Sequence, residues 1–137
     1  MIPYGARLQV APRVYERDKM NFEPNHLYHI YNQGNNLETV FYSRDNYFYF
    51  LKKIRTHVIP YADIVAWCLM PNHFHLLIYY RNEIEQQSEL HPKKYLNINH
   101  SIGIMLASYT RALNKQQNRS GSLFRKRCKA ACVTCHK

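Results

Sequence analysis

The stretch MPNHFHLLIYY, residues 70–80, decides the fold, because it places a turn between two apolar runs. The first run ends at residue 70 and meets Pro71-Asn72. This pair favours a tight turn, since proline presets its own φ angle and asparagine tolerates turn conformations. The second run opens with His73 and His75. These features predict two strands, over residues 63–70 and 73–80, joined by a short turn.

The alternation of side chains along a strand places His73 and His75 on one face, with Phe74 on the other. Two imidazoles side by side suit a divalent transition metal. The same spacing also fits two polar residues that only hydrogen-bond to their neighbours at the mouth of a strand. Spacing alone leaves both interpretations open.

Composition excludes several classes of protein. A chain of 137 residues is long enough for one domain with a real core. Its hydrophobic content of 46%, with 12 Tyr and 6 Phe, is typical of a globular chain and not of a disordered one. No apolar run approaches the ~20 residues of a membrane span, and the N-terminus has no secretory signal pattern. We therefore expect a cytoplasmic protein with no membrane partner and with reduced cysteines.

Charge is distributed very unevenly along the chain. Residues 1–89 hold nine basic and nine acidic side chains, whereas residues 90–137 hold ten basic and no acidic ones. A one-sided basic field suits a polyanion, and nucleic acid is the commonest. The candidate DNA-binding residues in this part of the chain are Arg111, Lys115, Arg119, Arg125, Lys126, Arg127 and Lys129.

Periodicity and turn signals predict the remaining elements. Strands are expected over residues 26–32 and 122–130, and helices from the N-cap Ser43 to just before Pro60 and over about residues 97–117, with Gly121 as the exit of the second helix. The order β-α-β-β-α-β predicts an α+β, ferredoxin-like domain with an antiparallel sheet and helices on one face. This domain spans residues 26–130, between an irregular N-terminal arm, 1–25, and a tail, 131–137. His29 on the first strand is expected to be a hydrogen-bonded sheet histidine and not a ligand.

Four blocks of sequence carry a resemblance to a known family. They are YHIYNQG (28–34), FYSRD (41–45), AWCLMPNHFHLL (66–77) and SGSLFR (120–125). With these blocks in this order, the chain resembles the single-tyrosine HUH transposases of the insertion-sequence-200-like group, and is most similar to the REP-associated tyrosine transposases. The resemblance covers roughly residues 26–129.

The resemblance implies a chemistry and a set of partners. His73 and His75 would be ligands of a divalent metal, Mg or Mn, that polarises a phosphate of single-stranded DNA. A tyrosine hydroxyl would attack that phosphorus and form a 5′-phosphotyrosine with a free 3′-hydroxyl, which is the covalent logic of nicking and strand transfer. Family members are homodimers that recognise hairpin DNA.

The chain departs from the family at the nucleophile. In the family, the tyrosine lies on a helix beyond the last strand, but no tyrosine follows Tyr109 here. Tyr109 lies on the apolar stripe of the second helix, where a buried hydroxyl is expected to be inert, so it is a weak candidate nucleophile. We therefore expect a truncated, catalytically incomplete transposase domain.

Alternatives remain open for the function and for the tail. A non-enzymatic remnant that still binds single-stranded nucleic acid is the main alternative. An RNA-binding sheet of the RRM kind shares the strand order, but its Lys/Arg-Gly-Phe signature is absent. In the tail, CVTCH (132–136) has haem-attachment spacing and, with Cys128, suggests a zinc knuckle. We expect neither a haem site nor a zinc knuckle, but unpaired thiols in a disordered tail.

Overall fold

The computed structural model describes residues 21–135, so most of the expected N-terminal arm and the last two residues lie outside the described part. Within it, the expected order of elements is confirmed, with one short 3-10 helix added after the first strand. The elements are β1 His26–Gln33, η1 Asn35–Leu37, α2 Arg44–His57, β2 Ala62–Met70, β3 His73–Tyr80, α3 Ile98–Gln117 and β4 Lys129–Cys132.

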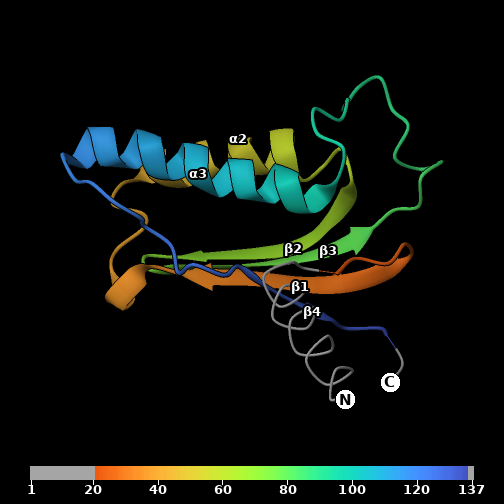
Figure 1. The fold of residues 1–137 in the computed structure, drawn as a ribbon, viewed down its shortest axis with the longest axis horizontal. Coiled ribbons are helices and arrows are strands. Elements are labelled where there is room, and N and C mark those ends of the chain that lie inside the picture. Colours follow the sequence, from red (N-terminus) through yellow and green to blue (C-terminus); the bar gives the residue numbers. More distant parts are fainter. Residues whose placement is uncertain (1–20, 136–137) are drawn as a thin grey trace, which may run out of the picture.

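The four strands form one antiparallel sheet in the order β2-β3-β1-β4. Both long helices cover the same face of this sheet, and within residues 21–135 no helix covers the opposite face (Figure 1). This arrangement confirms the ferredoxin-like α+β class. Between the sheet and the helices lies the core, where Phe74, Leu76 and Ile78 of β3 pack with residues such as Phe50 of α2 and Met105 of α3.

Local sequence explains where the helices begin and end. Ser43 caps α2 and forms a capping box with Asn46, as its side chain accepts a hydrogen bond from the backbone N–H of Asn46. Asn97 caps α3 through one hydrogen bond, which its side chain accepts from the backbone N–H of His100. We expected Gly121 to supply the left-handed turn that ends α3, and this is wrong. Asn118, with φ 52°, makes that turn. Asparagine tolerates this conformation, so the helix ends before Gly121 is reached.

The last strand also differs from expectation. It was predicted over residues 122–130, but β4 spans Lys129–Cys132, and the preceding segment runs irregularly with one isolated bridge between Phe124 and Gly34. Leu123 and Phe124 are consecutive, and both are buried in the core. A regular strand would point one of them away from the core, so the chain departs from strand geometry there. No helix among residues 21–135 has both the length and the apolarity needed to cross a membrane.

His57, at the end of α2, is buried, and its Nδ1 has no hydrogen-bond partner among the described residues. Burial lowers the pKa of His57, and the positive charges of Lys53 and Lys94 lower it further. The unfolded chain therefore takes up a proton near the ordinary histidine pKa of about 6.5, whereas the folded chain resists protonation until a lower pH. Stability is highest above that ordinary value and is lost as the pH falls from it toward the folded pKa.

We expect His57→Phe to reduce this acid sensitivity. The phenyl ring keeps the stacking position against Tyr95 and cannot be protonated. Urea unfolding midpoints of both proteins at pH 7.5 and 5.5 check this, and wild type is expected to lose more stability between the two values. An equal loss in both proteins would show that His57 does not carry the effect.

Candidate metal and nucleic-acid site

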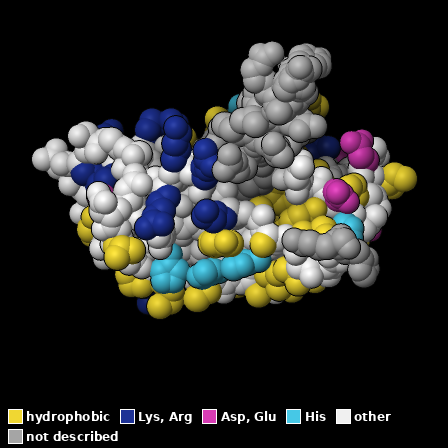
Figure 2. All heavy atoms as spheres, turned by 60° about the horizontal axis from the view of Figure 1, so that its bottom comes forward, with side chains coloured by type: hydrophobic (Ala, Val, Ile, Leu, Met, Phe, Trp, Pro, Cys, Tyr) yellow, Lys and Arg dark blue, Asp and Glu magenta, His cyan; other side chains and the backbone are white. Residues whose placement is uncertain are grey.

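Strand pairing gathers three histidines on the open face of the sheet. In the β1–β3 register, His75 lies opposite Tyr31, His73 opposite Gln33, and His29 opposite Leu77. Paired residues point to the same face, and Leu77 shares a face with His73 and His75, so all three imidazoles are on the side away from the helices. Figure 2 shows histidine side chains in a row on this face.

In both predicted metal ligands, His73 and His75, the Nδ1 atom lies within hydrogen-bond distance of a neighbouring side chain. The His73 and His75 rings have centroids 5.1 Å apart and are nearly perpendicular, at 85°. His73 Nδ1 lies 2.8 Å from Asn72 Oδ1, and His75 Nδ1 lies 2.8 Å from His29 Nε2. If each Nδ1 donates its proton to that partner, both Nε2 atoms are left as acceptors. Fixing one ring nitrogen so that the other can bind a metal is the usual arrangement around histidine ligands.

His29 has a role that sequence reasoning missed. It is hydrogen-bonded, as expected, but its partner is His75. Its ring also stacks on Tyr31, with centroids 4.5 Å apart, and lies 5.0 Å from the His75 ring. His29 thus orients His75. The face on which His29 lies follows from the sequence, but its proximity to His75 depends on the pairing of β1 with β3.

The electrostatics of the three imidazoles favour the neutral form of His75. Burial lowers the pKa of His75, and His29 and His73 lower it further. A neutral imidazole is the form that binds metal. Two half-buried imidazole nitrogens fit manganese or another transition metal better than magnesium, which prefers oxygen ligands.

Two of the predicted basic residues reach this same face. Arg125 donates a backbone hydrogen bond to Gln33 O at 2.9 Å. With its amide oxygen turned toward the guanidinium, Gln33 also accepts hydrogen bonds from Arg125 at 2.6–2.8 Å. Lys129 lies opposite Tyr31 in the β1–β4 register. Both cations are exposed, and Figure 2 shows lysine and arginine side chains gathered beside the histidine row. We call His73, His75, Arg125 and Lys129 the open-face site.

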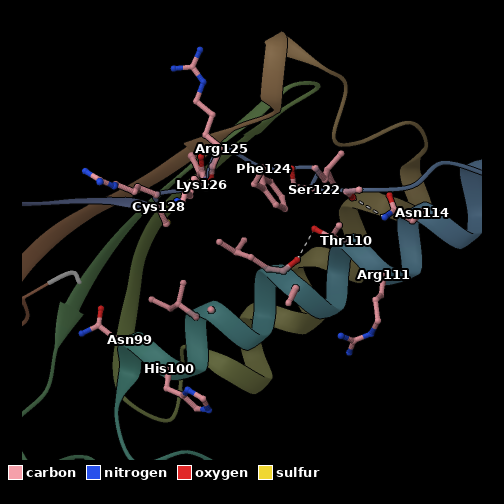
Figure 3. Close-up of a pocket in the computed structure, with 18 of the residues that line it drawn as sticks. Asn99, His100, Thr110, Arg111, Asn114, Ser122, Phe124, Arg125, Lys126 and Cys128 are labelled. Carbon is pink, nitrogen blue, oxygen red and sulfur yellow. Dashed lines mark hydrogen bonds between the residues drawn. The ribbon is translucent and has the colours of Figure 1, made fainter. Parts of the chain in front are cut away.

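The other predicted DNA-binding residues are spread over different surfaces. A groove of about 920 Å³ lies between α3 and residues 121–128, and its lining includes Arg111, Arg125, Lys126 and Arg127. Figure 3 shows Arg111 and Arg125 turned to opposite sides of this region. Lys115 is exposed on α3 and does not line the groove. Arg119 forms an ion pair with Glu38. Four of the seven predicted DNA-binding residues therefore line this groove, whereas Lys115, Arg119 and Lys129 do not.

Tyr109 lies on the helix side of the sheet, in the core. It is 1% exposed, and its hydroxyl donates a hydrogen bond to Val40 O at 2.6 Å. Burial raises the pKa of Tyr109, so the phenolate is strongly disfavoured. The sheet separates this hydroxyl from His73 and His75, which leaves it no access to a phosphate on the open face.

We expect Tyr109→Phe to be a stability mutation only. Removing the hydroxyl leaves the buried Val40 carbonyl without its partner, which typically costs about 1–3 kcal/mol. Urea unfolding measures that loss, and gel-shift titration with hairpin DNA is expected to give an unchanged affinity. A variant of unchanged stability that no longer binds hairpin DNA would contradict the structural role.

Four reduced cysteines were expected, with unpaired thiols in the tail, and this is wrong for two of them, because only Cys68 and Cys128 are free in this structure. Cys132 and Cys135 are joined in this structure, because the chain turns back after β4 and brings their Cα atoms to 5.6 Å. Cys128, which the alternative of a zinc knuckle would require, is not among the potential ligand atoms that lie together with those of Cys132 and Cys135. Burial raises the pKa of the Cys128 thiol to about 12, and its sulfur faces Tyr31 O at 3.7 Å. His136 of the haem-type spacing lies outside the described residues.

Comparisons with known proteins support the fold. No family model matches the sequence, and no curated protein does. Among solved structures, the chain is similar to a REP-associated tyrosine transposase bound to a REP hairpin, with a TM-score of 0.55 and 11% identity over 86% of this chain and 62% of the other. It is also similar to a bacterial tRNA(His) guanylyltransferase-like protein in complex with GTP, with a TM-score of 0.53 and 12% identity over 94% and 63%. The chain thus spans less than two thirds of either neighbour.

Proposed function

We propose that this chain is a transposase-like domain that binds single-stranded or hairpin DNA on its open sheet face and holds a divalent metal there with His73 and His75. The observation that carries the proposal is the open-face site itself. Two imidazoles, whose Nε2 atoms are acceptors when each Nδ1 donates its proton, lie beside two exposed cations, Arg125 and Lys129, on a sheet face that no helix of the described residues covers. A metal ion and positively charged side chains together can bind a phosphodiester, because both interact with its anionic oxygens.

Similarities to known proteins agree with this function. The HFH motif and the four sequence blocks resemble the single-tyrosine transposases, and one structural neighbour of that class is bound to a hairpin. The other neighbour is in complex with GTP, which also carries phosphate. Proteins with this fold therefore include ones with phosphate-bearing ligands, and as in the resembled family we propose a homodimer.

The residues of the open-face site and their neighbours have different roles. A bound metal would act as a Lewis acid on a phosphate oxygen. His29 and Asn72 orient the His75 and His73 rings through their Nδ1 atoms, and when each Nδ1 carries the proton, both Nε2 atoms can bind a metal. Gln33 fixes Arg125, which lowers the entropy lost when its remaining N–H groups contact a second phosphate oxygen. Tyr31, stacked on His29, offers an aromatic surface for an unpaired base.

We propose further that the chain is catalytically incomplete, because Tyr109 is buried on the far side of the sheet. Cleavage by a tyrosine would need a tyrosine hydroxyl on the open face of the sheet, next to the proposed metal. Tyr31 and Tyr79 share that face, but the Tyr79 hydroxyl donates to Asn25, and the Tyr31 ring is stacked. The alternative function is therefore binding alone, by a non-enzymatic relative of such transposases.

Incubation with end-labelled hairpin DNA and Mn²⁺ tests these proposals. We expect a salt-sensitive gel shift and no covalent adduct that survives denaturing electrophoresis. A covalent adduct would overturn the incompleteness, and its loss in Tyr31→Phe, but not in Tyr109→Phe, would identify the nucleophile. The absence of a shift at low salt would overturn DNA binding altogether. Light scattering of the free protein at the same concentrations tests the homodimer, which a monomeric mass would contradict.

A further inference from the structure

The end of β4 and the start of β1 bring one histidine and two cysteines together. His26, Cys132 and Cys135 each offer a ligand atom, and these atoms lie within 4.8 Å of one another. Within residues 21–135, no other group of three histidine, cysteine or acidic side chains meets this spacing. We propose that, in the dithiol form of the chain, these three residues bind a zinc ion, independently of His73 and His75.

The turn that carries the cysteines is fixed against β1 by contacts that do not involve sulfur. The backbone N–H of Val133 donates to Leu27 O at 2.8 Å, and the backbone N–H of Leu27 donates to Thr134 Oγ1 at 3.1 Å. His26 Nδ1 lies 2.9 Å from the same hydroxyl oxygen. The position of the two cysteines beside His26 therefore follows from strand pairing and its extension.

The Thr134 contact also favours His26 as a ligand. If His26 Nδ1 donates its proton to Thr134 Oγ1, Nε2 is left unprotonated for a metal. A hydrogen bond from the second ring nitrogen is the common way in which proteins orient a zinc-binding histidine.

The donor set matches zinc. Two sulfurs spaced Cys-x-x-Cys and one imidazole are ligands that zinc binds tetrahedrally, with a fourth position open to water when the protein supplies three. All three residues are half-buried, so an ion can enter from solvent. The pair of His73 and His75 lacks sulfur, which makes the two sites chemically distinguishable.

Zinc binding requires that the disulfide between Cys132 and Cys135 is first reduced. The structure joins the two sulfurs, so a phosphine must first supply two electrons, with two protons from water, to give two thiols and a phosphine oxide. Zinc then displaces one proton from each thiol and forms two zinc–thiolate bonds, with the release of two protons. The same closeness of the two cysteines serves the disulfide and the zinc-bound form.

A zinc ion here would connect the C-terminal end of β4, an edge strand of the sheet, to the start of β1. β4 has four residues and, among the strands that the structure describes, pairs only with β1. Its first residue is Lys129 of the open-face site. An ion held by His26 and by the cysteines at and after the other end of β4 would restrain this strand, so zinc is expected to raise the thermal unfolding temperature of the reduced protein.

The test uses the full-length chain carrying His73→Ala and His75→Ala, so that an ion at that pair is not counted. After reduction with a phosphine, Co²⁺ is added as a spectroscopic probe and then displaced by Zn²⁺. We expect thiolate-to-cobalt charge-transfer absorption, about one zinc per chain, and a higher unfolding temperature with zinc. Three substitutions in this background are each expected to weaken zinc binding by at least about tenfold: His26→Ala, Cys132→Ser and Cys135→Ser.

Matched controls separate this site from adventitious binding. Cys68 is an exposed free cysteine on β2, opposite His75, and His91 lies outside the strands and helices. Cys68→Ser and His91→Ala are expected to keep the zinc and the cobalt spectrum. Zinc that is absent, or that depends on Cys68 instead of Cys132 and Cys135, would overturn the proposal. Since Cys135 lies beyond the last strand, its substitution is not expected to prevent folding. Hairpin binding is measured separately, so a failure here leaves the proposed function standing.

Discussion

Replacing both His73 and His75 by alanine is expected to weaken Mn²⁺ binding at the open-face site by more than about 100-fold. The loss of partners that only orient a ligand typically costs 10–100-fold in metal affinity, and here the ligands themselves are removed. Both side chains are half-buried on the open face and do not fill the core, so the variant is expected to fold. Electron paramagnetic resonance of free Mn²⁺ during titration measures the affinity.

Two further variants make this prediction specific. His29→Phe keeps an aromatic ring beside Tyr31 but removes the hydrogen bond to His75 Nδ1, so an intermediate loss of about 10–100-fold is expected. His100→Ala, on α3 outside the open face, is expected to change nothing. Equal Mn²⁺ affinity of wild type and the double variant would show that the two imidazoles do not hold an ion.

Substitution of Arg125 and Lys129 by alanine is expected to produce the largest loss of DNA affinity among charge changes in this chain. Both cations lie on the histidine face, and Arg125 is held in place by Gln33. Each phosphate contact that is lost lowers the slope of log affinity against log salt by about one, so the double variant is expected to lower it by about two. Fluorescence anisotropy with labelled hairpin DNA at several salt concentrations measures both quantities.

A charge-matched control is available on the opposite side of the molecule. Lys52 and Arg55 are exposed on α2, which covers the other face of the sheet. Their double alanine variant removes the same charge and is expected to leave the slope nearly unchanged. If both double variants weakened binding equally, net charge alone would explain the affinity and the open-face site would have no special role.

The sequence was sufficient for the architecture and for the shared face of His73 and His75. Ser43, the turn at Pro71-Asn72 and the strict alternation in β3 are local signals, and local signals determine element type and facing. They do not determine which strands become neighbours. The contact of His29 with His75 and the placement of Lys129 depend on the pairing of β1 with both β3 and β4.

Other errors of prediction came from competition between local and tertiary preferences. Residues 122–130 were predicted to be a strand with a heavily basic face, but burying both Leu123 and Phe124 takes that segment out of the sheet. The turn after β4 places Cys132 and Cys135 beside His26, more than 100 residues earlier in the chain, and no local pattern near His26 indicates this. Cys128, grouped with the other cysteines by sequence, is half-buried, and its sulfur is not one of the ligand atoms that gather at His26.

The most direct test of the central claim is Mn²⁺ titration followed by NMR of the histidine ring signals, in the presence of hairpin DNA. The paramagnetic ion broadens signals of nuclei close to it. We predict that the ring signals of His73 and His75 broaden first, that His29 follows, and that His91 and His100 are unaffected at the same metal concentration. Uniform broadening, or sharp His73 and His75 signals at saturating Mn²⁺, would contradict a metal held on the open face of this sheet.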